Sequence, residues 1–277
     1  MAVITRDPAR ARSVVPAGVE LEGWAARDSW RARVRASDVV VHLAGEGVAD
    51  ERWTPEQLRR MRASRVETTE AIAEAVSGAL TKPVWVSTSA VGIYGMRLDD
   101  DVLDEQAAHG NDPLASICEA WEAATDSARR AGSRVAIARL GIVLGRDGGV
   151  LARMIPAFKA FTGGPIGDGV QWLSWVHIDD VVRGLLFAVD HAELDGPFNL
   201  TAPKPVTMND FARALGRALR RPCVMRVPPL ALRLALGEGR AQMLLTGQRA
   251  VPARLERAGF TFAFDTIDAA MNAIVRC

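Results

Sequence analysis

The sequence has 277 residues, 49% of them hydrophobic and 24% charged, and its formal net charge at pH 7 is +1. A chain of this length can bury a substantial core, as one large α/β domain or as a domain with a smaller appendage. The near-neutral charge gives no reason to expect nucleic acid or an anionic membrane as a partner.

The N-terminal apolar run stops at Arg6 and Asp7, and no apolar run is long enough to span a membrane. Neither the three cysteines, Cys118, Cys223 and Cys277, nor the four scattered histidines have the spacing of a disulfide framework or a metal site. We therefore expect a cytoplasmic protein with no signal peptide and no metal.

The first 150 residues alternate between short apolar runs and helical stretches. Residues 38–43, for example, form a continuous apolar run closed by Ala44 and Gly45, which is typical of a parallel strand buried on both faces. This alternation predicts a doubly wound parallel sheet with helices on both sides. The predicted strands are residues 2–5, 19–24, 38–43, 84–89 and 135–140, and the predicted helices are residues 55–76 and 114–131.

After residue 150 the alternation becomes less regular. We interpret residues 1–150 as a Rossmann-type domain and residues 151–277 as a smaller α+β lobe that is interleaved with the end of the sheet. The predicted helices of this part are residues 151–161, 179–190, 207–219, 229–236 and 266–276, and short strands are predicted at 172–176, at 198–200 and after Pro222.

Small, polar or glycine residues follow four of the predicted strands. In a doubly wound sheet, ligands bind beyond the carboxyl ends of the strands. These positions therefore predict a line of cofactor contacts. They are Thr5-Arg6, Leu43-Ala44-Gly45, Ser87-Thr88-Ser89 and Arg139-Leu140-Gly141.

Two of these segments resemble the extended short-chain dehydrogenase/reductases. Residues 40–45 (Val-Val-His-Leu-Ala-Gly) resemble the fourth strand of that superfamily, and residues 87–95 (Ser-Thr-Ser-Ala-Val-Gly-Ile-Tyr-Gly) resemble its catalytic Ser/Thr segment. Within the superfamily the chain is most similar to an epimerase-like subfamily, largely of unassigned activity. That similarity rests on Ser64-Arg65 and on residues 139–145, 163–167, 175–180, 199–203 and 247–249.

The chain departs from the superfamily at its N-terminus. The superfamily opens with a strand, a Gly-x-x-Gly-x-x-Gly turn that cradles the pyrophosphate, and a helix. Here Met1 falls where the second strand begins. We therefore expect an incomplete chain, with a misassigned start or a truncated N-terminus. The missing central strand would leave open edges on two neighbours, so we expect impaired cofactor binding and poor stability as a monomer.

The chain also lacks the superfamily's catalytic Tyr-x-x-x-Lys pair. Its only tyrosine is Tyr94, and the fourth residue after it is Leu98. On the helix that normally carries the pair, the matching positions are Leu114 and Cys118. A cysteine can deprotonate, although a helical cysteine among apolar neighbours is more often a packing residue.

The resemblance assigns candidate cofactor contacts. Arg6 ends the predicted second strand, where an arginine suits the 2′-phosphate of NADP and an acidic residue would suit the ribose of NAD. We therefore expect NADP rather than NAD; the alternative is that Arg6 lies in a solvated turn. The expected cofactor-binding residues are Thr5, Arg6, Leu43, Ala44, Gly45, Ser64, Ser87, Thr88 and Arg139.

Candidate catalytic residues are Ser87, Ser89 and His177, which could polarise a substrate carbonyl or hydroxyl. The serines could instead cap the following turn, and His177 could make a structural hydrogen bond. Candidate substrate contacts are Tyr94, Trp172 and Trp175, all three of which could also be core residues.

Two functions remain open from the sequence. The first is an NAD(P)-dependent oxidoreductase or nucleoside-diphosphate-sugar epimerase-like enzyme without the Tyr-Lys pair, in which hydride chemistry depends mainly on cofactor positioning. The second is an inactive NADP-sensing or protein-interaction module, since fold alone does not fix function. We expect a small-molecule substrate, and the helices could support a homodimer.

Overall fold

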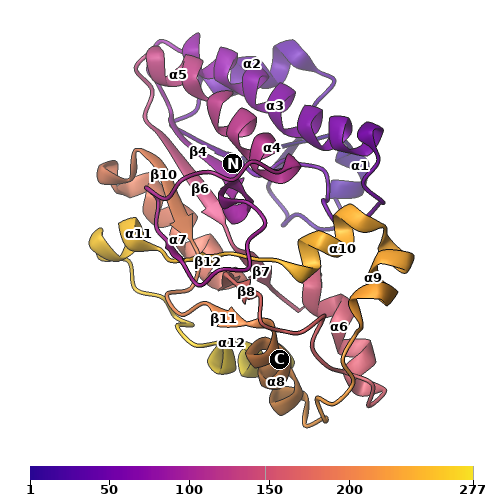
Figure 1. Ribbon diagram of the computed structural model, residues 1–277. Coiled ribbons are helices and arrows are strands. Elements are labelled where there is room, and N and C mark those ends of the chain that lie inside the picture. The colour runs from indigo at the N-terminus through magenta and orange to yellow at the C-terminus, as the bar shows by residue number, and fades with distance from the viewer. Residues whose placement is uncertain (147, 277) are drawn as a thin grey trace.

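A four-stranded parallel sheet forms the centre of the computed structural model, which describes residues 1–146 and 148–276 (Figure 1). Its strand order is β10-β6-β4-β3, and adjacent strands pair in parallel, with Val41 opposite Val86 and Val86 opposite Ala136. This arrangement confirms the predicted Rossmann-like fold. The four strands are β3 (Val39–His42), β4 (Val84–Ala90), β6 (Val135–Leu140) and β10 (Gly196–Leu200).

Helices from the first half of the chain cover one face of this sheet. Trp30 and Ile72 pack there against Trp85 and Ile137 of the strands. The long helix α3 begins where Thr54 caps it by accepting a hydrogen bond from the Gln57 amide and where Pro55 occupies the first turn. The helices of this layer are α2 (Arg27–Arg35), α3 (Pro55–Ser77), α4 (Pro113–Ala123) and α5 (Asp126–Arg130).

Helix α7 (Ile178–Asp190) packs against the opposite face of the sheet. Its residues Val181, Leu185 and Ala188 lie in one core cluster with Val86 and Ala136 of the strands. The helix covers β4 and β6, whereas the side chains of β3 on this face stay exposed, at 38% for Val39 and 44% for Val41.

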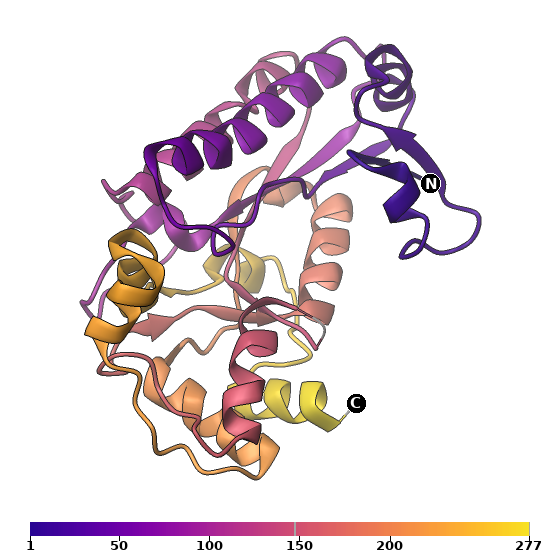
Figure 2. The ribbon, with the colours of Figure 1, turned by 90° about the vertical axis from the view of Figure 1, so that its right-hand side faces the viewer.

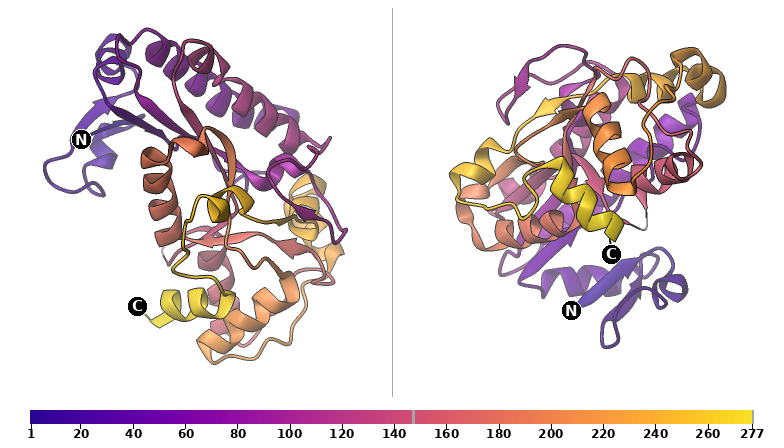
Figure 3. Two further views of the ribbon diagram at one scale, coloured as in Figure 1. Left: turned by 90° about the vertical axis from the view of Figure 1, so that its left-hand side faces the viewer. Right: turned by 90° about the horizontal axis from the view of Figure 1, so that it is seen from below.

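The first two strands form a separate parallel pair, β1 (Ala2–Thr5) with β2 (Glu20–Gly23). In Figures 2 and 3 this pair and the short helix α1 (Pro8–Ala11) stand apart from α7. β3 is therefore an edge of the main sheet and β1 has a single partner strand. The open strand edges expected from the sequence are thus confirmed.

The second half of the chain builds a lobe around its own core. Leu144, Phe158, Trp175, Phe211 and Met271 are all buried in it. Among the described residues, no helix is both long and apolar enough to cross a membrane. The helices of this half are α6 (Gly149–Lys159), α8 (Met208–Leu219), α9 (Pro229–Leu236), α10 (Glu238–Leu245), α11 (Ala253–Arg257), α12 (Ile267–Arg276) and the 3-10 turn η2 (Ala192–Leu194).

Short strand pairs connect this lobe to the sheet. β7 (Ile142–Leu144) pairs with β9 (Trp175–His177), β8 (Trp172–Leu173) with β11 (Val206–Thr207), and β5 (Val102–Leu103) with β12 (Arg249–Ala250). The strand predicted after Pro222 is wrong, because that extended segment makes only one isolated bridge, between Val227 and Ile166. The predicted helix 114–131 is broken near Thr125, whose hydroxyl donates to the Glu122 carbonyl.

A buried ion pair holds α4 against the sheet. Arg139, on β6, forms two hydrogen bonds of 2.8 Å with the carboxylate of Glu122 on α4. Arg139 also donates to the hydroxyl of Tyr94, and that hydroxyl donates to the Asn199 side chain at 2.7 Å. The network thereby joins β6, α4, β10 and the turn η1 (Val91–Tyr94).

The energetics of this network follow from its burial. The side chains of Arg139 and Glu122 are only 3% and 12% exposed. Burial alone would lower the pKa of Arg139, but the hydrogen bonds and charge of Glu122 raise it. The charge of Glu122 therefore offsets the free-energy cost of removing the Arg139 cation from water.

We predict that Glu122→Gln lowers the free energy of unfolding by about 3 kcal/mol, because it leaves a buried cation without a counter-charge. Urea denaturation measures this difference. The matched control is Glu70→Gln, at an exposed position of α3, which should change stability by less than about 0.5 kcal/mol. Equal stability of the two variants would show that the ion pair does not hold α4.

Candidate functional site

A cavity of about 850 Å³ lies between the carboxyl ends of the sheet strands and the C-terminal lobe. Ala90 and Gly141 line it at the ends of β4 and β6, α3 and α4 line one side, and α6, α9 and α10 line the other. Gly141 is needed at its position, because a Cβ atom there would lie 2.6 Å from the Ser174 carbonyl oxygen. The volume falls in the range of about 300–1,000 Å³ that is typical of small-molecule sites.

Helix α4 supplies an apolar wall of this cavity. Asp112 caps the helix by accepting hydrogen bonds from the amides of Leu114 and Ala115, which fixes where it begins. Leu114 and Cys118, which the sequence resemblance matched to the superfamily's Tyr-Lys pair, both line the cavity. Burial, together with the charge of Glu122, raises the pKa of the Cys118 thiol to about 12. Cys118 is therefore a neutral thiol at pH 7 and cannot act as a general base.

Arg65 of α3 brings a positive charge to the cavity wall. Its guanidinium donates to the carbonyls of Met61 and Glu46 and lies 5.2 Å from the centre of the Trp121 ring. Burial lowers the pKa of Arg65. The charge of the nearby Glu46 acts in the opposite direction and raises this pKa, although no carboxylate lies within ion-pair distance of the guanidinium in the part of the chain that the structure describes. Sequence reasoning missed this residue, although Ser64-Arg65 carried part of the family resemblance.

The loop between β3 and α3 ties the two sides of the cavity together. Its residues 47–50 line the cavity. Arg153 of α6 and Arg240 of α10 both donate to the carbonyl of Ala49, and Arg153 also pairs with Asp50 at 2.7 Å. From the loop itself, Arg52 donates to the last carbonyls of α9. In Figure 2, α9 and α10 lie below this loop.

The expected cofactor contacts of the first strands lie in two separate parts of the structure. Thr5 and Arg6 lie at the end of β1, and Arg6 is exposed. Residues 43–45 are exposed at the end of β3, and the Arg65 guanidinium lies against Gly45. Ser64 is half-buried and accepts a hydrogen bond from the Glu46 amide. The structure thus places residues 43–45 beside the cavity wall and Thr5 and Arg6 on the separate strand pair.

The serines of β4 are buried next to the cavity. Ser87 and Ser89 are 1% and 2% exposed, and the hydroxyl of neither has a hydrogen-bond partner among the described residues. Thr88 donates to the carbonyl of His42 and so fastens β4 to β3. Ala90, the next residue along the strand, lines the cavity, whereas the two serines do not.

Other candidate residues point into the protein interior. Tyr94 and Arg139 belong to the buried network described above, and burial raises the pKa of Tyr94. Trp175 is fully buried and donates to the Lys204 carbonyl. His177 caps α7 by accepting from the Asp179 amide, and burial lowers its pKa. Of the three expected substrate contacts, only Trp172 lines the cavity.

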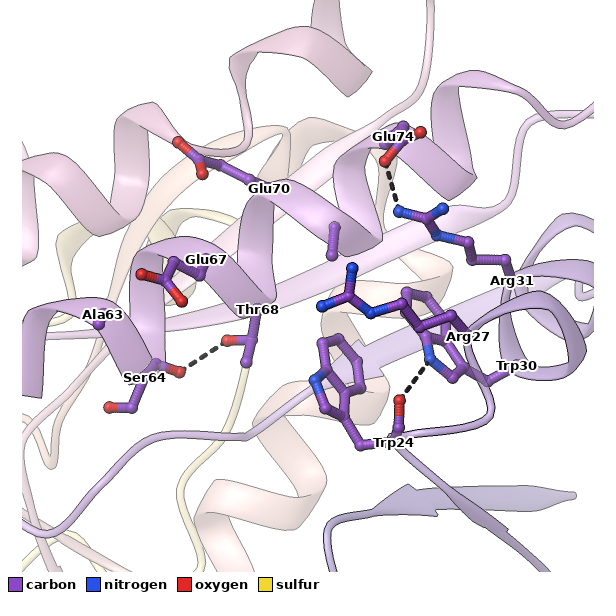
Figure 4. A pocket seen from close by; sticks show the side chains of 11 residues that line it. Trp24, Arg27, Trp30, Arg31, Ala63, Ser64, Glu67, Thr68, Glu70 and Glu74 are labelled. Atoms are coloured by element: carbon purple, nitrogen blue, oxygen red, sulfur yellow. Dashed lines mark hydrogen bonds and ion pairs between the residues drawn. The ribbon is translucent and has the colours of Figure 1, made fainter. Parts of the chain in front are cut away.

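A second, smaller pocket of about 360 Å³ lies between α2 and α3. Figure 4 shows Arg27 reaching from α2 toward α3 beside Trp24, with the carboxylates of Glu67, Glu70 and Glu74 along α3. This concentration of carboxylates opposes a phosphorylated ligand. The larger cavity is therefore the better candidate for the functional site.

Two family sequence models match this chain. The model described as the NAD dependent epimerase/dehydratase family matches residues 3–200, which include the whole parallel sheet. The model of a domain of unknown function, DUF1731, matches residues 227–274 of the C-terminal lobe.

Proteins with similar sequences and structures belong to the same family. An epimerase family protein of Mycobacterium leprae is 46% identical over 235 residues, which cover 85% of this chain and 76% of the relative. A chloroplastic epimerase family protein of Arabidopsis thaliana, an SDR39U1 homolog, is 39% identical over 281 residues, covering 99% of this chain and 79% of the relative. The crystal structure of the human epimerase family protein SDR39U1 (isoform 2) with NADPH is 31% identical and superposes with a TM-score of 0.84, covering 99% of this chain and 90% of that one. The chain therefore belongs to the NAD dependent epimerase/dehydratase family.

Proposed function

We propose that this protein is an NADP(H)-dependent oxidoreductase with epimerase-like chemistry, whose substrate enters the cavity between the sheet and the C-terminal lobe. The single observation that carries this proposal is the position of the cavity, which lies at the carboxyl ends of the parallel strands β4 and β6. Ligands bind at this edge of a doubly wound sheet. The relative solved with NADPH shares this fold over 99% of the chain.

In this proposal the exposed strand ends hold the cofactor. The main chain of residues 43–45 contacts it, because this segment is exposed and its Gly45 adjoins the cavity wall. Ser64, Thr88 and Arg139 contribute by fixing the segments around the strand ends, and Ser87 offers a buried hydroxyl that has no hydrogen-bond partner among the described residues. Thr5 and Arg6 contact the adenosine part, where Arg6 binds the 2′-phosphate that distinguishes NADP from NAD.

The cofactor supplies or accepts a hydride. The protein orients the substrate and excludes water, because most of the cavity wall is apolar. Ser89 is the leading candidate for polarising the substrate oxygen, because it is the buried residue directly before Ala90, which lines the cavity. The buried hydroxyl of Ser89 has no partner in the part of the chain that the structure describes, a condition that costs about 1–3 kcal/mol unless a ligand or water satisfies it. Ser87 and His177 are weaker candidates, since Ser87 lies farther from the strand end and the Nδ1 atom of His177 already accepts the Asp179 amide.

A second function, NADP sensing without turnover, is favoured by one specific observation. Leu114 cannot transfer a proton, and the raised pKa of Cys118 keeps its thiol neutral. The positions that match the family's catalytic pair are therefore inert. Sensing would need the same cofactor contacts but no substrate chemistry.

We predict that the protein binds NADPH at least about tenfold more tightly than NADH, because Arg6 adds a charge-assisted hydrogen bond to the 2′-phosphate. Isothermal titration calorimetry measures both affinities. Arg6→Ala should remove this preference, and Arg10→Ala, at an exposed position of α1, should keep it. Equal affinities in the wild type, or binding of neither nucleotide, would contradict the cofactor assignment.

We predict that the wild type consumes NADPH with at least one member of a panel of carbonyl compounds, and that Ser89→Ala slows this turnover about tenfold or more with little change in NADPH affinity. Loss of NADPH absorbance measures the rate. Ser37→Ala, on the loop after α2, is the control and should leave it unchanged. Tight NADPH binding with no turnover across the panel would favour the sensor.

A further inference from the structure

We propose that the cavity accepts an amphipathic carboxylate, with a lipophilic body against the apolar wall and the carboxylate paired with Arg65, rather than a nucleoside diphosphate sugar. This inference rests on the proposed function only in taking the cavity as the substrate site. Three features of the cavity carry it: the composition of its wall, the hydrogen bonds that its polar groups already make, and the Arg65 guanidinium, which has no ion-pair partner among the described residues.

The wall of the cavity is mainly apolar and rich in methionine. Five of the eight methionines in the chain line it, and α4 adds Leu114 and Ile117. Methionine side chains are flexible and polarisable, so a wall of this kind adapts to aliphatic chains or irregular rings. The five are Met61, Met96, Met154, Met208 and Met243.

Most polar side chains in the wall are already bound to the protein. Ser174 donates to the Gln248 carbonyl at 2.7 Å, and Gln248 donates in turn to the Gly95 carbonyl at 2.6 Å. Arg153 pairs with Asp50, and Arg240 donates to Ala49. A nucleoside diphosphate sugar needs hydrogen-bond partners for its base, its ribose, its pyrophosphate and its sugar. This wall offers too few free groups for it.

Arg65 and Trp121 are the exceptions. The Arg65 guanidinium uses two of its five N–H groups on main-chain carbonyls and has no ion-pair partner among residues 1–146 and 148–276. The indole Nε1 of Trp121, whose ring lies beside that guanidinium, is buried without a hydrogen-bond acceptor in the same part of the chain. A partly buried cation next to an unpaired donor favours an anion, and a carboxylate matches the planar guanidinium.

The charge and the apolar wall adjoin each other. Met61, whose carbonyl accepts from Arg65, lines the cavity one turn earlier on α3, and Trp121 lies one turn after Ile117 on α4. A ligand with a single carboxylate at one end of a lipophilic body can therefore reach both features at once. A ligand that carries charge along its length would instead place part of that charge against the apolar wall.

The test compares decanoate, decanol and UDP-glucose as probes by isothermal titration calorimetry on the full chain without cofactor. We expect decanoate to bind at least about tenfold more tightly than decanol, and UDP-glucose more weakly than either. Arg65→Met should remove the preference for decanoate while decanol affinity stays within about twofold. Arg65→Lys should restore part of the preference, and Arg62→Met, at an exposed position of α3 outside the cavity wall, should keep it.

Three outcomes would overturn the inference: equal binding of decanoate and decanol by the wild type, tighter binding of UDP-glucose, or a carboxylate preference that survives Arg65→Met. If Arg65→Met does not fold, the test uses the wild type at two salt concentrations. Raising the salt concentration should weaken decanoate binding and leave decanol binding unchanged. NADPH affinity is measured in a separate titration. If NADPH does not bind in that titration, the proposed function is contradicted, whereas the result for decanoate still tests the carboxylate site.

Discussion

The buried ion pair between Arg139 and Glu122 is the constraint on which the geometry of the site depends. It fastens α4 to the end of β6, and through the Tyr94 hydroxyl it reaches Asn199 on β10. Asn199 donates to the carbonyls of Leu103 and Val251, so the same network extends to the short strands that carry the C-terminal lobe. A pair of charges this far from water is costly to separate. It therefore holds the two halves of the chain in one arrangement.

The cavity follows from that arrangement. Because α4 is fixed against the sheet, Leu114, Cys118 and Trp121 face the space between the strand ends and the C-terminal lobe. The loop before α3 closes part of this space, since Arg153 and Arg240 bind the carbonyl of Ala49 from the opposite side. Helix α4, to which the sequence resemblance assigns the superfamily's catalytic pair, is here an apolar wall. Substrate selection thus falls to lipophilic contact and to Arg65.

Much of the fold could be predicted from the sequence, because buried parallel strands appear as continuous apolar runs. The predicted strand at residues 135–140 and the helix at 55–76 match β6 and α3 closely. The short strand pairs could not be predicted, because two-residue strands depend on distant partners rather than on local pattern. The segment after Pro222 was predicted as a strand because of its apolar pattern, but among the described residues it makes one isolated bridge, between Val227 and Ile166, rather than a continuous ladder.

The sequence predicted where the site lies but not which side chains form it. The strand-end rule identified residues 43–45 and Gly141, which lie at the cavity or beside its wall. It did not reveal that the side chains of Tyr94 and Arg139 turn inward, because their partners Glu122 and Asn199 are distant in the sequence. Arg65 and Trp121 were missed because each sits on an ordinary helical pattern. They stand out because, among the described residues, Arg65 has no carboxylate within ion-pair distance and the indole N–H of Trp121 has no acceptor.

The central claim is that the cofactor and the substrate meet at the strand ends beside α4. Hydrogen–deuterium exchange with saturating NADPH tests it most directly, because it locates binding without assuming a reaction. The account predicts slower amide exchange in residues 43–47 and 89–95 and along α4, at the wall of the large cavity. Unchanged exchange in these segments, or protection confined to the pocket between α2 and α3, would contradict it.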